Sequence, residues 1–177
     1  MLMDYVFGND LCLETRSGPI KSNFNSILEE KLLVIFEELE TSTNSEWAAV
    51  DCRLKHQITS RRVTLEKKGQ DPIEATNINN FILLSNHDVC DDERRYFVLD
   101  VSTHRKDDRK YWDNVYDNCF NKEVGSAFYS YLSEINTENF YPQDYPITKN
   151  KLKSISKRLD TVNLILMNEF ILKNEDF

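Results

Sequence analysis

Short apolar runs recur along the first hundred residues, and each ends in polar residues. Alternating runs of this length are typical of half-buried β-strands, and continuous runs are typical of strands buried on both faces of a parallel sheet. The pattern predicts strands at 11–15, 31–36, 62–66, 73–76, 81–84 and 96–101. The runs at 31–36, 81–84 and 96–101 have the character of buried strands. The charged segment 67–72 predicts a hairpin between its two neighbours.

Apolar residues three and four positions apart predict helices elsewhere. The clearest pattern covers 43–58, and others predict a short helix at 22–30, two helices with aromatic faces at 107–120 and 123–135, and a long terminal helix. A turn is expected at 17–19 and a proline-punctuated loop at 141–146. Strands dominate before residue 102 and helices dominate after it. The expected fold is therefore α/β, with a sheet-based core at 1–104 and a helical C-terminal extension at 105–177.

Composition limits the class of protein. A chain of 177 residues forms one domain, or one domain with a small helical appendage, and 40% hydrophobic with 29% charged residues is typical of a globular protein. The formal net charge is −8, which argues against a broad basic surface. Contact with nucleic acid would therefore depend on a local basic element.

The chain offers no sign of a membrane span or a secretory signal. No apolar run approaches the roughly 20 residues that a spanning helix needs, and the first residues lack a basic segment. The cysteines are scattered singly at Cys12, Cys52, Cys90 and Cys119. Free buried thiols in a reducing, intracellular compartment are expected.

Polar side chains stand where the predicted buried strands end or begin. Glu37 and Glu38 follow one strand, Asn86 follows the next, and Arg95 precedes the last. Ligands of open parallel sheets bind at the carboxyl ends of the strands. Two carboxylates there can hold a hard cation through water and activate a nucleophilic water, and an amide can orient that water.

Each of these residues also has a plainer explanation. Paired glutamates often end a strand in solvent, a lone asparagine often forms a turn, and lysines at a hairpin tip are often merely solvated. The functional hypothesis therefore depends on the order and spacing of the whole set.

That order resembles superfamily 3 helicases, AAA+ ATPases that include the replication helicases of parvoviruses and papillomaviruses. The resemblance is carried by the apolar strand before Glu37-Glu38, the hairpin with Lys68, the run ending in Asn86, and Arg95 four residues before Leu99. The strings at 24–34 and 92–102 resemble more specifically the helicase domain fused to phage primase-polymerases, also found in plasmids and giant viruses. The resemblance covers most of the chain and implies a partial AAA+-like parallel sheet with a hairpin insertion.

The resemblance also implies roles for individual residues. Glu37 would approach Mg²⁺, although the family often has aspartate at this position, and Glu38 would polarise the water that attacks ATP. Asn86 matches the asparagine that senses the nucleotide. Arg95 matches the arginine that reaches the nucleotide of the neighbouring subunit, with Arg94 as its immediate competitor.

The same resemblance implies the partners. Lys68 and its neighbour Lys67 match the basic hairpin tip that contacts single-stranded DNA in a central channel. The complete protein would assemble with copies of itself into a ring, a hexamer, and would use ATP and Mg²⁺.

One departure from the family is large. A phosphate-binding loop needs the pattern Gly-x-x-x-x-Gly-Lys, because backbone N–H groups cradle the phosphates and the lysine neutralises them. The chain contains no Gly-Lys dipeptide. In the family that loop lies just upstream of a segment resembling residues 1–8, so we expect the chain to begin within the helix that follows it. A separate P-loop or primase polypeptide is one expected partner.

The expected function is that of an ATP-dependent replicative DNA helicase module that is inactive alone. One alternative is a non-catalytic DNA-binding or ring-assembly subunit derived from such a helicase, which would show no ATP turnover even with a P-loop supplied. A second alternative is a small metal-dependent nuclease that uses the acidic residues Asp88, Asp91, Asp92 and Glu93. These residues fit a solvated loop more simply, and DNA cleavage with magnesium and without ATP would distinguish the nuclease.

Overall fold

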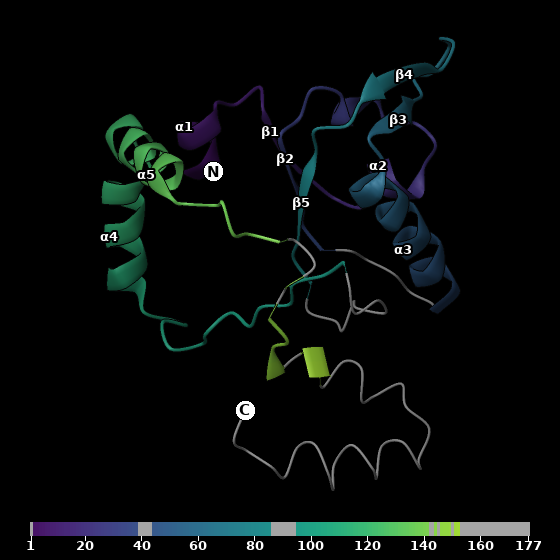
Figure 1. The fold of residues 1–177 in the computed structure, drawn as a ribbon. Coiled ribbons are helices and arrows are strands. Elements are labelled where there is room, and N and C mark those ends of the chain that lie inside the picture. The colour runs from purple at the N-terminus through teal and green to yellow at the C-terminus, as the bar shows by residue number, and fades with distance from the viewer. Residues whose placement is uncertain are drawn as a thin grey trace, which may run out of the picture. The chain divides into compact units, whose positions relative to one another are not determined.

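A three-stranded parallel sheet forms the centre of the larger of two compact units (Figure 1). The computed structural model describes residues 2–38, 44–85, 95–141, 144, 146–149 and 151–152. The larger unit comprises Met1–Asn86 and Thr103–Glu138, and the smaller comprises His87–Ser102 and Asn139–Phe177. The expected α/β class with a parallel sheet, a hairpin and helices is confirmed. The expected domain boundary at residue 104 stays a prediction.

The sheet has the strand order β1-β2-β5, with β1 at Cys12–Thr15, β2 at Leu33–Phe36 and β5 at Asn80–Leu83. The central strand β2 is entirely apolar because it is flanked by a strand on each side and covered by helices. Its residues Val34 and Phe36 are fully buried. The parallel register places Thr15, Phe36 and Leu83 level with one another, so the three strands end at one edge.

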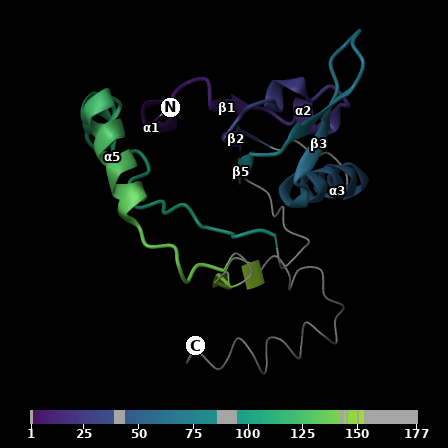
Figure 2. The same cartoon turned by 45° about the horizontal axis from the view of Figure 1, so that its top comes forward.

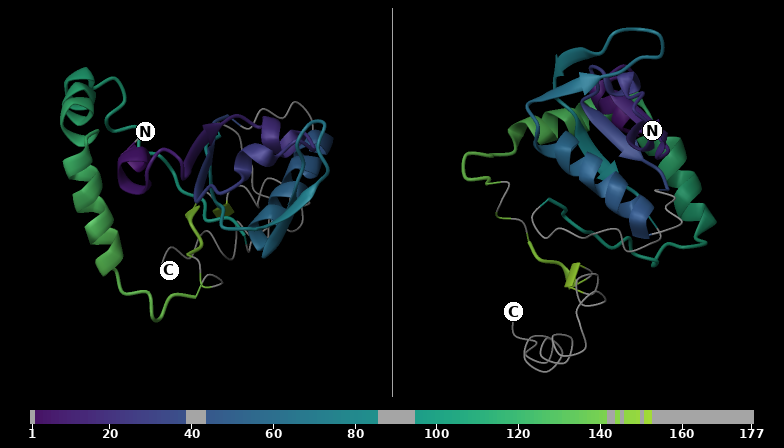
Figure 3. Two further views of the ribbon diagram at one scale, coloured as in Figure 1. Left: turned by 90° about the horizontal axis from the view of Figure 1, so that it is seen from above. Right: turned by 90° about the vertical axis from the view of Figure 1, so that its right-hand side faces the viewer.

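Two helices and a 3₁₀ turn lie on one side of this sheet (Figure 3). They are α2 (Gly18–Lys21), η1 (Ser26–Leu28) and α3 (Asn44–Thr59). Their buried apolar side chains complete the core together with β2: Ile20, Leu28, Trp47, Val50 and Leu54. Burying each such side chain contributes about 1.5–3 kcal/mol, so this core holds the sheet edge in place.

The predicted hairpin is confirmed as β3 (Arg62–Leu65) paired antiparallel with β4 (Ile73–Thr76). Figure 2 shows it projecting from the unit. Asparagine side chains hold the hairpin and the segment that follows it. Asn25 donates to Thr64 O at 3.0 Å and accepts from Glu66 N at 2.8 Å. Asn79 donates to Leu28 O and Lys31 O, which ties the segment after β4 to the entry of β2.

Three further helices are α1 (Leu2–Phe7), α4 (Arg109–Cys119) and α5 (Lys122–Glu134). Helix α5 packs against α1 (Figure 1), and the approach is so close that a Cβ atom on Gly125 would lie 2.3 Å from the carbonyl oxygen of Tyr5. This position therefore requires glycine. The side chains of Asp108 and Asn121 cap α4 and α5 by accepting from backbone N–H groups.

The structure corrects three expectations of secondary structure. The expected turn at 17–19 is the beginning of α2, in which Pro19 occupies the first turn, where its missing N–H costs nothing. The expected helix at 22–30 is only η1. Residues 96–101 form no strand, and Phe97, Leu99 and Val101 are exposed.

The absence of a strand at 96–101 has a physical reason. The carbonyl oxygens of Tyr96 and Val98, which a neighbouring strand would engage, accept instead from the side chains of Lys151 and Thr148, each at 2.7 Å. Only Tyr96 is buried in this segment. An apolar run becomes a strand only where another strand pairs with it. Most of the expected terminal helix lies outside the described residues.

Candidate functional site

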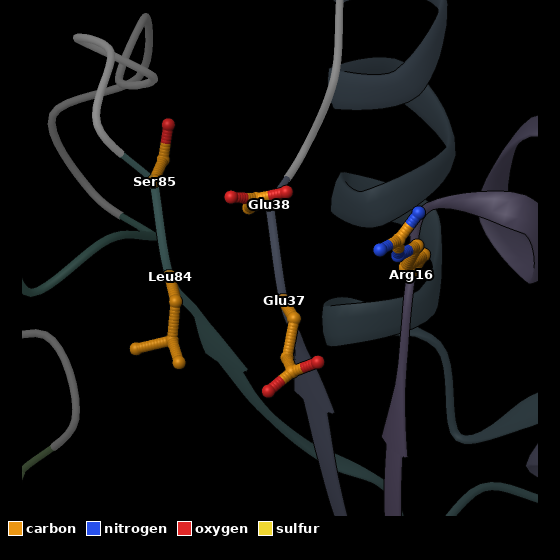
Figure 4. A pocket seen from close by; sticks show the side chains of 5 residues that line it. All are labelled: Arg16, Glu37, Glu38, Leu84 and Ser85. Carbon is orange, nitrogen blue, oxygen red and sulfur yellow. The ribbon is translucent and has the colours of Figure 1, made fainter.

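A cavity of about 330 Å³ opens at the edge where the three parallel strands end (Figure 4). Its lining comes from the residues directly after each strand: Arg16 after β1, Glu37 and Glu38 after β2, and Leu84 and Ser85 after β5. The ladder hydrogen bonds continue into this edge, because Glu37 N donates to Thr15 O and Leu84 N donates to Phe36 O. The cavity is therefore built on paired backbone and occupies the place where open parallel sheets bind ligands.

Glu38 has an unusual backbone. Its φ angle is 45°, in the left-handed region that side chains other than glycine rarely adopt. Such a conformation costs roughly 1–3 kcal/mol and is found disproportionately at functional sites. Figure 4 shows that the Glu38 and Glu37 side chains leave the chain in different directions. The cavity edge thus presents two exposed carboxylates in different orientations.

Glu14 brings a third carboxyl group to the same edge. The register pairs Glu14 with Ile35, so Glu14 and Glu37 extend from the same face of the sheet. A side-chain hydrogen bond with Glu37 raises the pKa of Glu14, and partial burial and the charge of Glu37 raise it further. Negative charge is therefore concentrated here, as it is in sites that attract a cation.

Sequence reasoning missed Glu14, Arg16 and Ser85. The rule that selected Glu37, a polar residue directly after a strand, also selects Arg16. Glu14 lies inside a strand, and its proximity to Glu37 follows only from the parallel register. Arg16 is exposed and adds a cation to the cavity lining, and Ser85 adds a hydroxyl group.

The other residues chosen from the sequence fall in different places. Lys67 and Lys68 are exposed at the hairpin tip, where Gly69 has a φ angle of 76° and Gln70 N donates to Lys67 O. Asn86 and Arg94 lie outside the described residues, as do the acidic residues considered for a nuclease. Arg95 is half-buried in the smaller unit. The expectation that it precedes a buried strand is wrong.

The described residues offer neither a membrane span nor a ready-made metal cluster. No helix within these ranges is long and apolar enough to cross a membrane. Among the same residues no group of three or more histidine, cysteine, aspartate or glutamate side chains could hold a metal ion. Of the three cysteines within the described ranges, all with free thiols, Cys12 is buried, Cys52 is exposed and Cys119 is half-buried. The expectation of free thiols is confirmed for these three, and the expectation that they are buried is wrong for Cys52 and Cys119.

Comparison with known proteins identifies the family. Residues 1–95 match the profile described as "Family of unknown function (DUF5906)", and the chain belongs to this family. It is also similar to the DNA primase-polymerase of Nitratiruptor phage NrS-1, with 25% identity over 165 residues. The match covers 91% of this chain but 23% of the phage protein, so the chain spans less than a quarter of that relative.

Solved structures confirm the fold. The apo structure of the NrS-1 C-terminal region (305–718) superimposes with a TM-score of 0.77 at 22% identity, covering 98% of this chain and 44% of that one. A second apo structure, the A form of the same region, gives a TM-score of 0.72 at 22% identity, covering 97% of this chain and 42% of that one. The arrangement of sheet, hairpin and helices is thus shared with the phage protein.

Proposed function

We propose that the chain is a module of an ATP-dependent replicative DNA helicase of the superfamily 3 type. In this proposal the chain supplies the sheet edge at which ATP is hydrolysed and the hairpin that contacts DNA. It is inactive alone. The observation that carries the proposal is the meeting of Glu37, Glu38, Arg16 and Ser85 around one cavity at the carboxyl edge of a parallel sheet. Similarity to a DNA primase-polymerase supports a role in DNA replication.

The residues at the edge fit magnesium. Mg²⁺ is held in nucleotide sites by one or two carboxylates together with water and phosphate oxygens, so a cage of three protein ligands is not needed. Glu37 would hold the ion, with Glu14 hydrogen-bonded behind it. When bound, Mg²⁺ neutralises negative charge that develops on the phosphates.

The chain's own residues would divide the remaining work. Glu38 would orient the attacking water and accept its proton, and Asn86 would hold the same water without a change of charge. Arg16, the cation in the cavity lining, fits an anionic phosphate oxygen. Arg95, or Arg94 beside it, would reach the nucleotide of a neighbouring copy in a ring, which we propose to be a hexamer.

Nucleotide binding needs a phosphate cradle that these 177 residues do not contain, since no glycine precedes a lysine. A P-loop would be supplied by another segment or by a separate polypeptide. Single-stranded DNA would contact Lys67 and Lys68, whose hairpin is anchored through Asn25 to the covered face of the sheet. Hydrolysis at the edge and movement of the hairpin would then be mechanically linked.

The proposal is tested by ATP hydrolysis in a chain joined to a P-loop segment from a superfamily 3 helicase. Single-stranded DNA should stimulate turnover, and Glu38→Gln should lower it by about 10²–10⁴-fold while nucleotide binding is retained. Glu30→Gln is a matched control, because Glu30 is also exposed and also has a positive φ angle, 57°, but lies outside the cavity. Equal loss in both variants, or turnover that does not depend on Glu38, would refute the assignment.

A further inference from the structure

Helix α4 carries an aromatic face that the described part of the chain leaves uncovered. None of its residues is buried. Its apolar residues are spaced so that they share one side of the helix: Tyr111, Trp112, Val115, Tyr116 and Cys119. Tyr111 is 38% exposed, Trp112 44% and Tyr116 64%. An amphipathic helix normally buries such a stripe, so this one is available to a ligand.

The start of the helix holds two of these rings in fixed orientations. Arg105 donates to the carboxylate of Asp108 at 2.8 Å, and its guanidinium group lies 4.8 Å from the centre of the Tyr111 ring. Trp112 Nε1 donates to Arg105 O at 2.8 Å. The Tyr111 and Trp112 rings meet edge to face at 5.1 Å. We call Arg105, Asp108, Tyr111 and Trp112 the aromatic cap.

The aromatic cap lies in a locally basic segment of an acidic protein. Residues 104–110 contain four cations, Arg105, Lys106, Arg109 and Lys110, and two carboxylates, Asp107 and Asp108, which gives a local charge of +2 against −8 for the chain. Lys106, Arg109 and Lys110 are exposed. Lys110, Asp113 and Asp117 are spaced so that they share the polar side of the helix, whereas Lys106 and Arg109 stand at its start, nearer the rings. Positive charge beside uncovered rings suits a ligand that has both phosphate groups and unpaired bases, since the cations can bind the phosphates and the rings can stack on the bases.

We infer that α4 and its aromatic cap form a second surface for single-stranded DNA, separate from the hairpin. Bases stack on Trp112 and Tyr116, and phosphates lie along Lys106 and Arg109. Proteins that bind single strands without sequence preference combine these two elements, because every base has a π-face. The inference depends on the DNA-binding part of the proposed function, but it requires neither ATP nor the hairpin lysines.

A second copy of the chain is the competing occupant of this face. Tyrosine, tryptophan and arginine are enriched at protein interfaces, but lysine is depleted there. Lys106, next to Arg105 of the aromatic cap, therefore favours DNA. Duplex DNA fits less well, because its bases are stacked inside the helix.

Tryptophan fluorescence tests the inference directly, because the two tryptophans differ in exposure. Trp47 is 7% exposed in the core of the larger unit, whereas Trp112 is 44% exposed. In a Trp47→Phe background of the full chain, titration with an oligothymidine of about 16 nucleotides should quench the emission of Trp112, and a duplex of the same length should not. Persisting emission with the oligothymidine bound would overturn the inference.

Affinity measured by anisotropy of labelled oligothymidine provides a second readout. Trp112→Ala and Tyr116→Ala should each weaken binding by about 5- to 150-fold, the range that corresponds to removal of one stacked base. Tyr131→Ala is the matched control, because Tyr131 is 61% exposed on α5 but has no basic segment beside it. It should leave the affinity unchanged, and an equal loss of affinity in all three variants would overturn the inference.

Two further outcomes separate this surface from the hairpin and from self-association. Lys67→Ala with Lys68→Ala should leave the quenching of Trp112 in place at saturating DNA. If binding depends only on those lysines, the proposed function survives and the α4 surface is refuted. If Trp112→Ala and Tyr116→Ala alter the sedimentation of the chain but not its affinity for DNA, the face joins copies of the protein, and the inference is equally refuted.

Discussion

Glu38 combines a strained backbone with a position at the lip of the cavity. A left-handed conformation costs residues with a Cβ atom roughly 1–2 kcal/mol, and this cost is absent for glycine. Strain of this kind persists when the surroundings fix it, and the residue directly before Glu38 is held by the hydrogen bond from Glu37 N to Thr15 O. The left-handed backbone therefore lowers the stability of the fold, while the Glu38 side chain lines the cavity.

Two substitutions at Glu38 measure that strain. Glu38→Gly should unfold at higher urea concentration than Glu38→Ala, with a difference in unfolding free energy of about 1 kcal/mol, because only glycine accepts the left-handed backbone freely. Glu37, which has no positive φ angle, should show the opposite order, since glycine is ordinarily the more destabilising of the two. The same order at both positions would contradict the strained conformation.

The carboxyl pair of Glu14 and Glu37 makes folding stability depend on pH. The hydrogen bond with Glu37 raises the pKa of Glu14 above its ordinary value of 4.5, so the folded chain retains this proton more tightly than the unfolded chain. The contribution of this pair is fully present below pH 4.5 and is lost as the pH rises through the raised pKa. Glu14→Gln removes the titrating carboxyl group, so this contribution to the pH dependence disappears.

Urea unfolding at low salt should therefore show that the wild-type chain loses stability relative to Glu14→Gln as the pH rises through this window. Because Glu14 is exposed, the effect should be small and should weaken in salt. A stability difference that stays constant with pH would contradict the shared proton.

Individual residues of the site differed in how well the sequence predicted them. Glu37 and Glu38 were selected because they end a recognisable apolar run. Arg16 follows β1, and the sequence prediction does not include it although the same physical rule applies. Glu14 could not be predicted from the sequence. It lies inside a strand, and only the register that pairs it with Ile35 brings it close to Glu37.

At the scale of elements, the hairpin is the part that the sequence predicted most closely. Alternating residues in 62–66 and 73–76 with a glycine-containing turn between them fix both the strands and their register. Its attachment could not be predicted, because Asn25 reaches β3 from about forty residues away in the chain. The segment 96–101 failed for the opposite reason: its local pattern was strand-like, but side chains of residues 148 and 151 engage its carbonyl groups.

The hairpin tip has a test of its own in the salt dependence of DNA binding. Lys67→Ala with Lys68→Ala should weaken binding to single-stranded DNA of any sequence. The slope of log K against log salt should become shallower by roughly 0.7 for each phosphate that the tip no longer binds. Lys122→Ala, at the exposed start of α5, is a control that should leave the slope unchanged. An unchanged slope in the double variant would show that the tip is merely solvated.

At the scale of the molecule, the proposed function makes this chain one part of a catalyst, because its sequence has no Gly-Lys pair for a phosphate-binding loop. The purified 177-residue chain should bind ATP weakly and hydrolyse it negligibly, because positioning and charge stabilisation of the phosphates supply nearly all of the catalysis in such reactions. Steady-state hydrolysis with Mg²⁺ and single-stranded DNA measures this. Turnover of about 1–100 s⁻¹, the range of kinases, would mean that the chain binds phosphates by residues outside our proposal.

The central claim is that hydrolysis takes place between copies, with Glu38 on one and Arg95 on the next. A planar, permanently charged guanidinium group supplied by a neighbour is worth about 10³–10⁵ in rate where such groups have been measured. With a P-loop segment joined to the chain, Glu38→Gln and Arg95→Ala should each be inactive as separate rings. Nucleotide binding and folding should be retained in both.

The most direct measurement is the ATP hydrolysis rate of these two variants mixed into the same rings. Partial recovery of turnover is predicted, because a mixed ring contains interfaces that pair an intact Glu38 with an intact Arg95. Arg94→Ala in place of Arg95→Ala serves as the control and should remain active without mixing. No recovery in rings shown to be mixed would contradict the account, and recovery only with Arg94→Ala would move the role to Arg94.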